Sequence, residues 1–273
     1  MNEIIKLQRI LKEHNITPTK RYGQNFLVNN DIVNNIIRSL GNMKGKTVLE
    51  IGPGIGALTN DLLKTDIKSL FVVEIDKKVL PILHKIQLGT TKHFEIINAD
   101  ALKIDESSII DEDYIIVANL PYNISTLLIV KWLKNLSNIN QIVIMLQKEV
   151  ADRILAQPST HSYGRLSILA QFTCDCELLF DIEPENFFPV PKVTSSIIKL
   201  TPKRPEPSAR EINNIEKLCK STFNFRRKKI KKSLEKIFNC PEIELEKLQI
   251  DYNKRPEQLT IDEFFKISTI MEQ

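Results

Sequence analysis

The sequence has no long hydrophobic run. Its apolar stretches are as short as strands, and none approaches the roughly 18 residues that indicate a transmembrane helix. The N-terminus, MNEIIKLQRILKEHN, spaces its isoleucines and leucines as a helix does, with charges between them, so it lacks the unbroken apolar stretch of a signal peptide. We therefore expect a cytoplasmic protein that has no contact with a membrane.

Cysteine and histidine are also scarce. The four cysteines, Cys174, Cys176, Cys219 and Cys240, lack the paired spacing of a zinc site, and the four histidines do not cluster near them. Free thiols in a reducing compartment are the simplest interpretation. We expect no metal centre.

The remaining composition is that of a globular protein. The chain has 273 residues, of which 42% are apolar and 26% charged, with no internal repeat and no low-complexity tract. This length allows one large domain, or one medium and one small domain.

The net charge of +4 lies entirely in the C-terminal quarter. Residues 1–200 contain 22 basic and 22 acidic residues, whereas residues 201–273 contain 16 basic and 12 acidic residues. Within RRKKIKK (226–232), six of seven positions are basic. A charge run is usually a solvated helix face. This run is denser than such faces usually are, so it favours contact with a polyanion.

Residues 47–147 alternate between strand and helix patterns. Five short, nearly continuous apolar segments predict strands buried on both faces of a parallel sheet, at 47–52, 70–76, 94–100, 114–120 and 141–147. Helix-like segments separate them. Such alternation is typical of a doubly wound, Rossmann-like α/β sheet. Two later segments, 177–184 and 195–202, could add an antiparallel hairpin at the edge of that sheet.

A proline-rich segment marks a domain boundary. TPKRPEPSAR (201–210) contains three prolines, and the sequence after it has helical periodicity. We predict a catalytic domain over 1–203 and a small all-α domain over 207–273.

A glycine-rich turn follows the first predicted strand. In LEIGPGIGALT, Gly52, Gly54 and Gly56 are spaced G-x-G-x-G, which differs from the G-x-G-x-x-G of dinucleotide folds and from the nucleotide-triphosphate P-loop. Glycine lets the backbone approach a ligand closely. Nucleotide and methyl-donor sites both use such turns, and a purely structural turn remains an alternative.

Polar residues end three other predicted strands. Glu74, 22 residues after Gly52, could accept both hydroxyls of a ribose, and Asp100 could accept an exocyclic amine of adenine. Either acid could instead cap a helix, as we expect of Asp76. The strand before Asn119-Leu120-Pro121-Tyr122 ends in an amide, a rigid ring and an aromatic, a combination suited to holding a flat polar molecule.

Taken in order, these residues resemble the motifs of S-adenosylmethionine-dependent methyltransferases. Three further segments, YGQNFLVN (22–29), NFFPVPKVTSSII (186–198) and NKRPEQLTIDEFF (253–265), narrow the resemblance to the ribosomal RNA small-subunit adenine N6-dimethyltransferase family over essentially the whole chain. The resemblance implies a class I methyltransferase sheet with a small C-terminal all-α domain.

The resemblance also implies roles for individual residues. Those implied in catalysis are Asn119, Leu120, Pro121, Tyr122 and Phe187. Those implied in binding S-adenosylmethionine are Gln24, Asn25, Leu27, Gly52, Gly54, Glu74, Asp100 and Asn119. Phosphate contacts to RNA are expected from Lys20, Arg21, Arg226, Arg227, Lys228 and Lys229.

The implied reaction is dimethylation of two adjacent adenosines in a hairpin loop near the 3′ end of small-subunit (16S) rRNA. S-adenosylmethionine would leave as S-adenosylhomocysteine, and the substrate would be an assembling ribosomal subunit bound by a monomer. Two alternatives stay open: a large-subunit rRNA methylase of the antibiotic-resistance type, and a non-catalytic assembly factor on the same fold.

Overall fold

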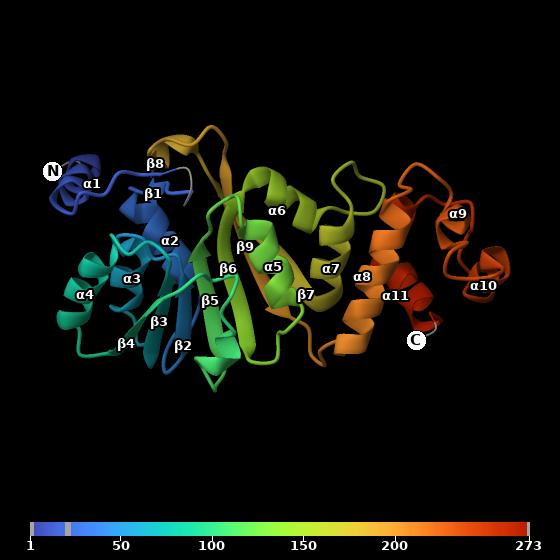
Figure 1. The fold of residues 1–273 in the computed structure, drawn as a ribbon, viewed down its shortest axis with the longest axis horizontal. Helices are drawn as coiled ribbons and strands as arrows, with labels where there is room; N and C mark the ends of the chain where they lie inside the picture. Colours follow the sequence, from blue (N-terminus) through green and yellow to red (C-terminus); the bar gives the residue numbers. More distant parts are fainter. Residues whose placement is uncertain (1–2, 20–22, 272–273) are drawn as a thin grey trace. The chain divides into compact units, whose positions relative to one another are not determined.

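The chain forms two compact units (Figure 1). The computed structural model describes residues 3–19 and 23–271. The first, the sheet unit, comprises Met1–Lys131, Ser137–Ala151 and Glu177–Thr201. The second, the helical unit, comprises Trp132–Leu136, Asp152–Cys176 and Pro202–Gln273. Residues 152–176 thus pack with the C-terminal segment, although they precede the predicted linker.

A seven-stranded sheet forms the centre of the sheet unit, with strand order β4-β3-β2-β5-β6-β9-β7. Strands β2 to β6 run parallel, and β9 runs antiparallel to β6. The strands are β2 (Thr47–Ile51), β3 (Ser69–Glu74), β4 (His93–Asn98), β5 (Tyr114–Asn119), β6 (Ile139–Gln147), β7 (Cys174–Ile182) and β9 (Ser195–Pro202). The predicted α/β sheet is confirmed, with β7 and β9 adjacent at its edge.

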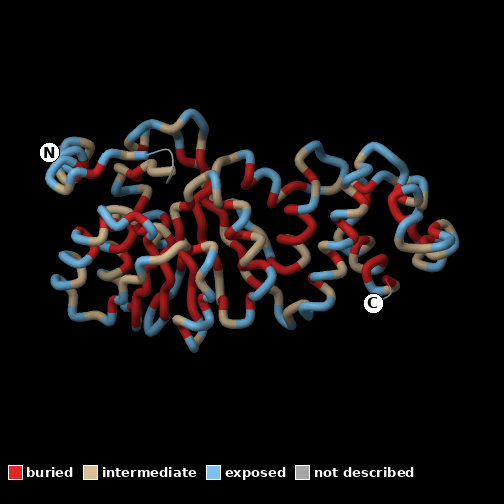
Figure 2. Tube along the Cα trace, viewed as in Figure 1, coloured by how far each residue is buried: buried red, intermediate tan, exposed pale blue. Residues whose placement is uncertain are grey.

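Helices and a second, two-stranded sheet complete this unit. The helices are α1 (Glu3–Glu13), α2 (Asn30–Ser39), α3 (Ala57–Leu62), α4 (Leu80–Leu88), α5 (Ser125–Leu133) and the start of α6 (Lys148–Leu155). Every residue of β2 and β3 is buried, which explains why these strands read as unbroken apolar runs (Figure 2). In the small sheet, β1 (Phe26–Leu27) pairs with β8 (Phe187–Phe188).

The helical unit has its own apolar core, which includes Tyr163, Ile215 and Phe264. Its helices are α7 (Arg165–Thr173), α8 (Ala209–Phe223), α9 (Ile230–Leu234), α10 (Pro241–Lys247) and α11 (Ile261–Thr269). Helix α8 begins with a capping box, in which the Ser208 hydroxyl accepts from Glu211 N at 3.2 Å. In the described part of the chain, no helix is long and apolar enough to cross a membrane.

One charged residue lies inside the parallel sheet. Glu50 in β2 is 1% exposed, and its carboxyl accepts a hydrogen bond from the Thr59 hydroxyl of α3 at 2.6 Å. Burial raises the pKa of Glu50 to about 8. The hydrogen bond opposes this rise, and the nearby Glu74 adds to it. Glu50 therefore ties the strand to the helix, and burial favours its neutral, protonated form.

Glu50→Gln should raise the thermal stability of the protein at alkaline pH. The folded pKa of about 8 lies above the ordinary value of 4.5, so the stability that protonated Glu50 contributes is complete below pH 4.5 and is lost as the pH rises through 8. Glutamine keeps an oxygen for Thr59 and has no proton to lose. We expect a Tm gain at pH 8 of roughly 2–4 °C per kcal/mol recovered, shrinking toward pH 5.

Thermal unfolding followed by circular dichroism at several pH values measures this difference. Glu149→Gln, at an exposed position of α6, is the control and should leave the Tm unchanged. A Tm loss of equal size at every pH in the Glu50→Gln protein would contradict the interpretation.

Candidate active site

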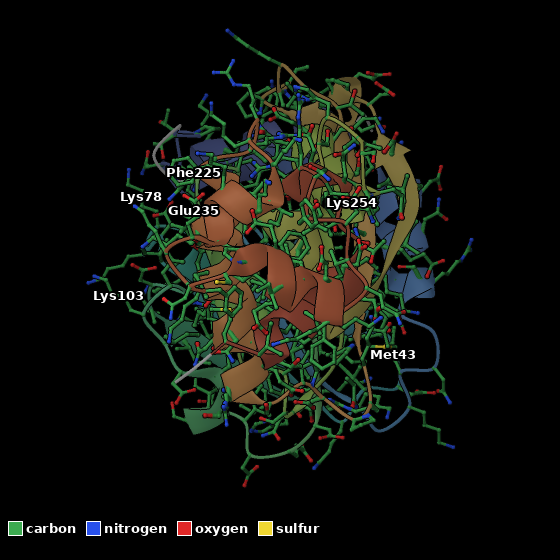
Figure 3. All side chains as sticks on the ribbon, turned by 90° about the vertical axis from the view of Figure 1, so that its right-hand side faces the viewer. Met43, Lys78, Lys103, Phe225, Glu235 and Lys254 are labelled. Atoms are coloured by element: carbon green, nitrogen blue, oxygen red, sulfur yellow. The ribbon has the colours of Figure 1, made fainter. Side chains whose placement is uncertain are left out.

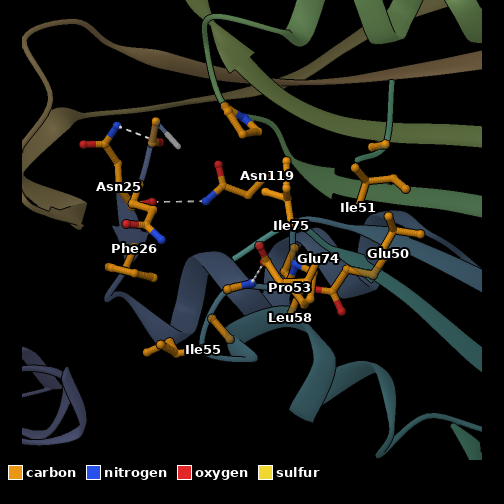
Figure 4. Close-up of a pocket in the computed structure, with 18 of the residues that line it drawn as sticks. Asn25, Phe26, Glu50, Ile51, Pro53, Ile55, Leu58, Glu74, Ile75 and Asn119 are labelled. Carbon is orange, nitrogen blue, oxygen red and sulfur yellow. Dashed lines mark hydrogen bonds between the residues drawn. The ribbon is translucent and has the colours of Figure 1, made fainter. Parts of the chain in front are cut away.

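A pocket opens in the sheet unit where the parallel strands β2 to β5 reach their carboxyl ends (Figure 4). Ligands of doubly wound sheets bind at this edge. All eight residues predicted to bind the cofactor line the pocket: Gln24, Asn25, Leu27, Gly52, Gly54, Glu74, Asp100 and Asn119. The fold thus gathers into one cavity residues that are up to 95 positions apart in the sequence.

The segment from Gly23 to Leu27 forms one wall of the pocket. A Cβ atom on Gly23, which has a φ of +56°, would lie 2.9 Å from Pro121 Cβ. Glycine is therefore required for this close approach. Further along, a Cβ on Gly54 would lie 3.2 Å from the Phe26 ring. The segment thus lies directly against both the glycine turn and the end of β5.

Asn119 lies at the end of β5, and its side chain has a defined orientation. Its Nδ2 donates a hydrogen bond to the Asn25 carbonyl at 3.2 Å (Figure 4), which assigns the other side-chain position to oxygen. Within the described residues, nothing donates to Asn119 Oδ1 or to the Leu120 carbonyl. Pro121 follows and has no N–H. Both acceptors therefore lack a donor in the described part of the chain; Asn119 lines the pocket, whereas Leu120 is 1% exposed and does not belong to the lining.

Two acidic side chains at the strand ends differ in burial. Glu74 is 7% exposed, and its carboxyl accepts from Gly54 N at 3.1 Å and from Asp76 N at 2.7 Å. Burial raises the pKa of Glu74, while these backbone donors oppose the rise. Asp100 is more accessible, and its Oδ1 accepts from Leu102 N at 3.0 Å. Glu74 is thus bonded directly to the glycine turn.

Asp76 and Lys131 support the pocket in ways that the sequence did not indicate. Asp76 accepts from Lys78 N at 3.0 Å, at the turn before α4, and also from Gln24 Nε2 at 2.8 Å. The expected cap is wrong, because the N-cap of α4 is Val79 and Asp76 bonds to the turn before the helix. The sequence did not indicate the contact with Gln24.

Lys131 of α5 fixes the loop that follows Asp100. Its Nζ donates to the carbonyls of Ala101 (2.8 Å) and Ile104 (2.6 Å), and it pairs with Glu106 at 2.8 Å. The sequence feature that could have indicated this role is the single lysine in the apolar helix STLLIVKWL. Glu50, also a lining residue, could have been noticed as the acid within an apolar strand.

The predicted aromatic residues do not line the pocket. The Tyr122 hydroxyl lies 2.8 Å from the Ser195 hydroxyl of β9, and burial raises its pKa. Phe187 is 1% exposed, because β8 pairs with β1 and places its ring in the core of the sheet unit. Phe188, its neighbour, is partly exposed. In this conformation neither ring offers a face to the cavity.

The predicted RNA-binding residues differ among themselves. Lys20 and Arg21 lie outside the described residues. In the helical unit, Arg226 is engaged: its Nε pairs with Glu257 at 2.6 Å and its Nη2 donates to the His161 carbonyl at 2.7 Å. Arg227, Lys228 and Lys229 are exposed. In the described part of the chain, Lys229 is the one whose side chain bonds to another residue: its Nζ donates to Asn253 Oδ1 at 2.8 Å.

Comparison with known proteins gives consistent relatives. The chain is 40% identical to the "Ribosomal RNA small subunit methyltransferase A" of a Wolbachia endosymbiont of Drosophila simulans, over 96% of both chains. It is 39% identical to the protein of that name in Zymomonas mobilis, over 96% of this chain and 94% of the relative.

Solved structures share the fold. A dimethyladenosine transferase from Plasmodium falciparum superposes with a TM-score of 0.76 at 26% identity, covering 88% of this chain and 94% of the other. The 23S rRNA methyltransferase ErmE gives 0.70 at 24% identity, covering 91% and 100%. The predicted class I methyltransferase fold is therefore confirmed. Since the family model for ribosomal RNA adenine dimethylase also matches residues 15–273, the chain belongs to the ribosomal RNA adenine dimethylase family.

Proposed function

We propose that this protein dimethylates the N6 amines of two adjacent adenosines in a hairpin loop near the 3′ end of small-subunit (16S) rRNA, with S-adenosylmethionine as methyl donor. The observation that carries the proposal is a pair of acceptors without a donor in the described chain at the end of β5, Asn119 Oδ1 and the Leu120 carbonyl, of which Asn119 lines the pocket. Family membership and the names of the relatives support the choice of substrate.

The two acceptors suit an amine that is a poor nucleophile. The lone pair of adenine N6 is delocalised into the ring, so the enzyme must orient the amine and localise that lone pair. Asn119 Oδ1 and Leu120 O would each accept one N6 hydrogen and leave the lone pair directed at the donor. Orientation and preorganised dipoles supply the rate enhancement, without a strong base.

The residues of the pocket fit S-adenosylmethionine. Glu74 would accept the ribose hydroxyls with its remaining lone pairs, and Asp100 the adenine amine. The glycine turn lets the cofactor approach the backbone, and Asn25 and Leu27 would meet its methionine end. The cofactor supplies an electrophilic methyl group on a sulfonium. N6 would gain that methyl group, the electrons of the broken sulfur–carbon bond would remain with sulfur, and N6 would lose its proton to water.

The aromatic residues have proposed roles that require access. We propose that Tyr122 and Phe187 stack on the target adenine, which must be unstacked because a base within a duplex cannot reach the site. Phe187 is buried in the described conformation. Its stacking would therefore need the contact between β1 and β8 to open.

The substrate we favour is an assembling small subunit, bound by a monomer in the cytoplasm. The large-subunit alternative stays open from the sequence, and the ErmE structure, at 24% identity, indicates the fold alone. Mass analysis of rRNA from cells lacking the gene separates the two: loss of dimethyladenosine from small-subunit rRNA supports the proposal, and loss from large-subunit rRNA overturns it.

Asn119→Ala should abolish most methyl transfer. Removing one preorganised hydrogen-bonding group typically costs about 10²–10³ in kcat, whereas cofactor affinity should change by less than about tenfold, the equivalent of ~1.4 kcal/mol. Transfer of labelled methyl groups to small subunits from cells lacking the gene is the assay. Asn35→Ala, at an exposed position of α2, is the control. Full activity in the Asn119→Ala protein would exclude a catalytic role for Asn119, whereas a lack of transfer by the unaltered protein would favour a non-catalytic assembly factor.

Asp100→Asn should weaken binding of S-adenosylmethionine by about 3–10-fold, because a charge-assisted hydrogen bond becomes a neutral one. Lys131→Met should have a similar effect without touching the cofactor, since the loop after Asp100 loses its anchor. Isothermal titration calorimetry measures both. Asp113→Asn, at an exposed position, is the control. Unchanged affinity in both variants would argue against the adenine contact.

Arg226→Ala and Arg227→Ala should behave differently. Arg226 is bonded within the helical unit, so its loss should destabilise the protein by about 1–3 kcal/mol. Arg227 is exposed, and its replacement should leave the Tm unchanged. It should instead reduce the slope of log affinity for RNA against log salt by about 0.7–0.9. Thermal unfolding and salt titrations of RNA binding distinguish them. Equal effects of both variants on the salt slope would show that Arg226 also contacts phosphate.

A further inference from the structure

The loop between α8 and α9 presents its residues in two directions. Arg226 is directed into the helical unit, toward Glu257 and the His161 carbonyl. On either side of it, Phe225 and Arg227 are exposed. The loop is also held by its backbone, since Ile230 N donates to Lys254 O at 2.7 Å. Arg226 thus serves as an internal anchor, and its neighbours form an outer surface.

Phe225 occupies a fixed place on that outer surface. Its N–H donates to Thr222 O at 3.0 Å, and its carbonyl accepts from Lys228 N at 2.8 Å. Phe225 is 42% exposed, and Figure 3 labels it at the upper left. The ring is therefore presented from a turn that two backbone hydrogen bonds stabilise.

The surroundings of Phe225 are cationic. Lys236 Nζ lies over the ring, 5.9 Å from its centroid. The side chains of Arg227, Lys228 and Lys232 are exposed, and within the described chain none of the three forms a hydrogen bond or ion pair with another residue. Ile243 of α10, in the same unit, is also an exposed apolar residue, at 52%. Its charged neighbours in the segment PEIELEK are mostly acidic and not basic.

We propose that Phe225 stacks on an unpaired RNA base while Arg227, Lys228, Lys232 and Lys236 contact the phosphates beside it. This proposal rests on the proposed function, in that it assumes an RNA substrate, and it concerns a surface of the helical unit separate from the pocket. Single-stranded nucleic acid is bound by this combination of an aromatic face and cations that follow the backbone. A protein partner would require a wider apolar surface than one ring provides.

The test is fluorescence anisotropy of the full-length protein with a labelled single-stranded oligouridine of about 10 nucleotides, a length within the site size of single-strand binders. Phe225→Ala should lower the affinity by about 5–150-fold, as expected for one stacked base. The salt slope should stay unchanged, because no phosphate contact is removed. The double variant Arg227→Ala/Lys228→Ala should instead reduce the slope, by about 0.7 for each contact.

Matched variants separate stacking from simple apolar contact. Phe225→Trp should retain affinity and Phe225→Leu should not, because leucine is apolar without an aromatic face. Ile243→Ala should bind as the unaltered protein does. Equal affinity of Phe225→Ala and unaltered protein would overturn the proposal, as would full binding by Phe225→Leu, which would indicate a general apolar docking contact such as one to a protein.

The proposed function and this inference can fail separately. If the unaltered protein methylates small subunits but Phe225→Ala has no binding defect, only the stacking contact is wrong. If the unaltered protein binds no oligouridine, the stacking proposal is overturned, whatever its transfer activity. If it binds oligouridine through Phe225 but transfers no methyl group to any rRNA, the surface stands and the proposed reaction fails.

Discussion

The hydrogen bond between the Asn119 amide and the Asn25 carbonyl connects the two parts of the chain that form the site. One end belongs to the parallel sheet and the other to the segment before β1. The bond turns the Asn119 oxygen outward as an unsatisfied acceptor. Without it, the amide could rotate and present its N–H₂ group, which cannot accept from an amine. The proposed chemistry therefore depends on the segment from Gly23 to Leu27, which is far from Asn119 in the sequence.

The pocket is also lined by two buried carboxyl groups. Glu50 and Glu74 both line it, and burial raises the pKa of each. Each is tied to the element next to it, Glu50 to Thr59 of α3 and Glu74 to the glycine turn. Burial disfavours the charged form of both carboxyls, and a cofactor with positive charge and hydrogen-bond donors would favour that form. The site thus carries a stability cost that ligand binding can offset.

In the helical unit, one basic side chain is bonded internally and its basic neighbours are exposed. Arg226 uses its guanidinium to hold the loop after α8 from within, and this leaves the adjacent exposed cations available for a polyanion. A dense basic run would repel itself if all its charges shared one surface. Directing one arginine inward, onto Glu257, relieves that repulsion and fixes the turn that presents Phe225.

The sequence by itself determined the α/β sheet, the glycine turn and the polar strand ends, because buried parallel strands require unbroken apolar runs and their ends require special residues. The resemblance identified Gln24, Asn25 and Leu27 as pocket residues, and the structure places them there. Tertiary structure alone decided which side chains bond or pack within the protein and which stay exposed. Arg226 and Arg227 are adjacent arginines that the sequence does not distinguish. Only the packing shows that Arg226 is bonded within the helical unit and Arg227 is exposed. The burial of Phe187 and the clamp made by Lys131 are likewise set by long-range contacts, which no local pattern encodes.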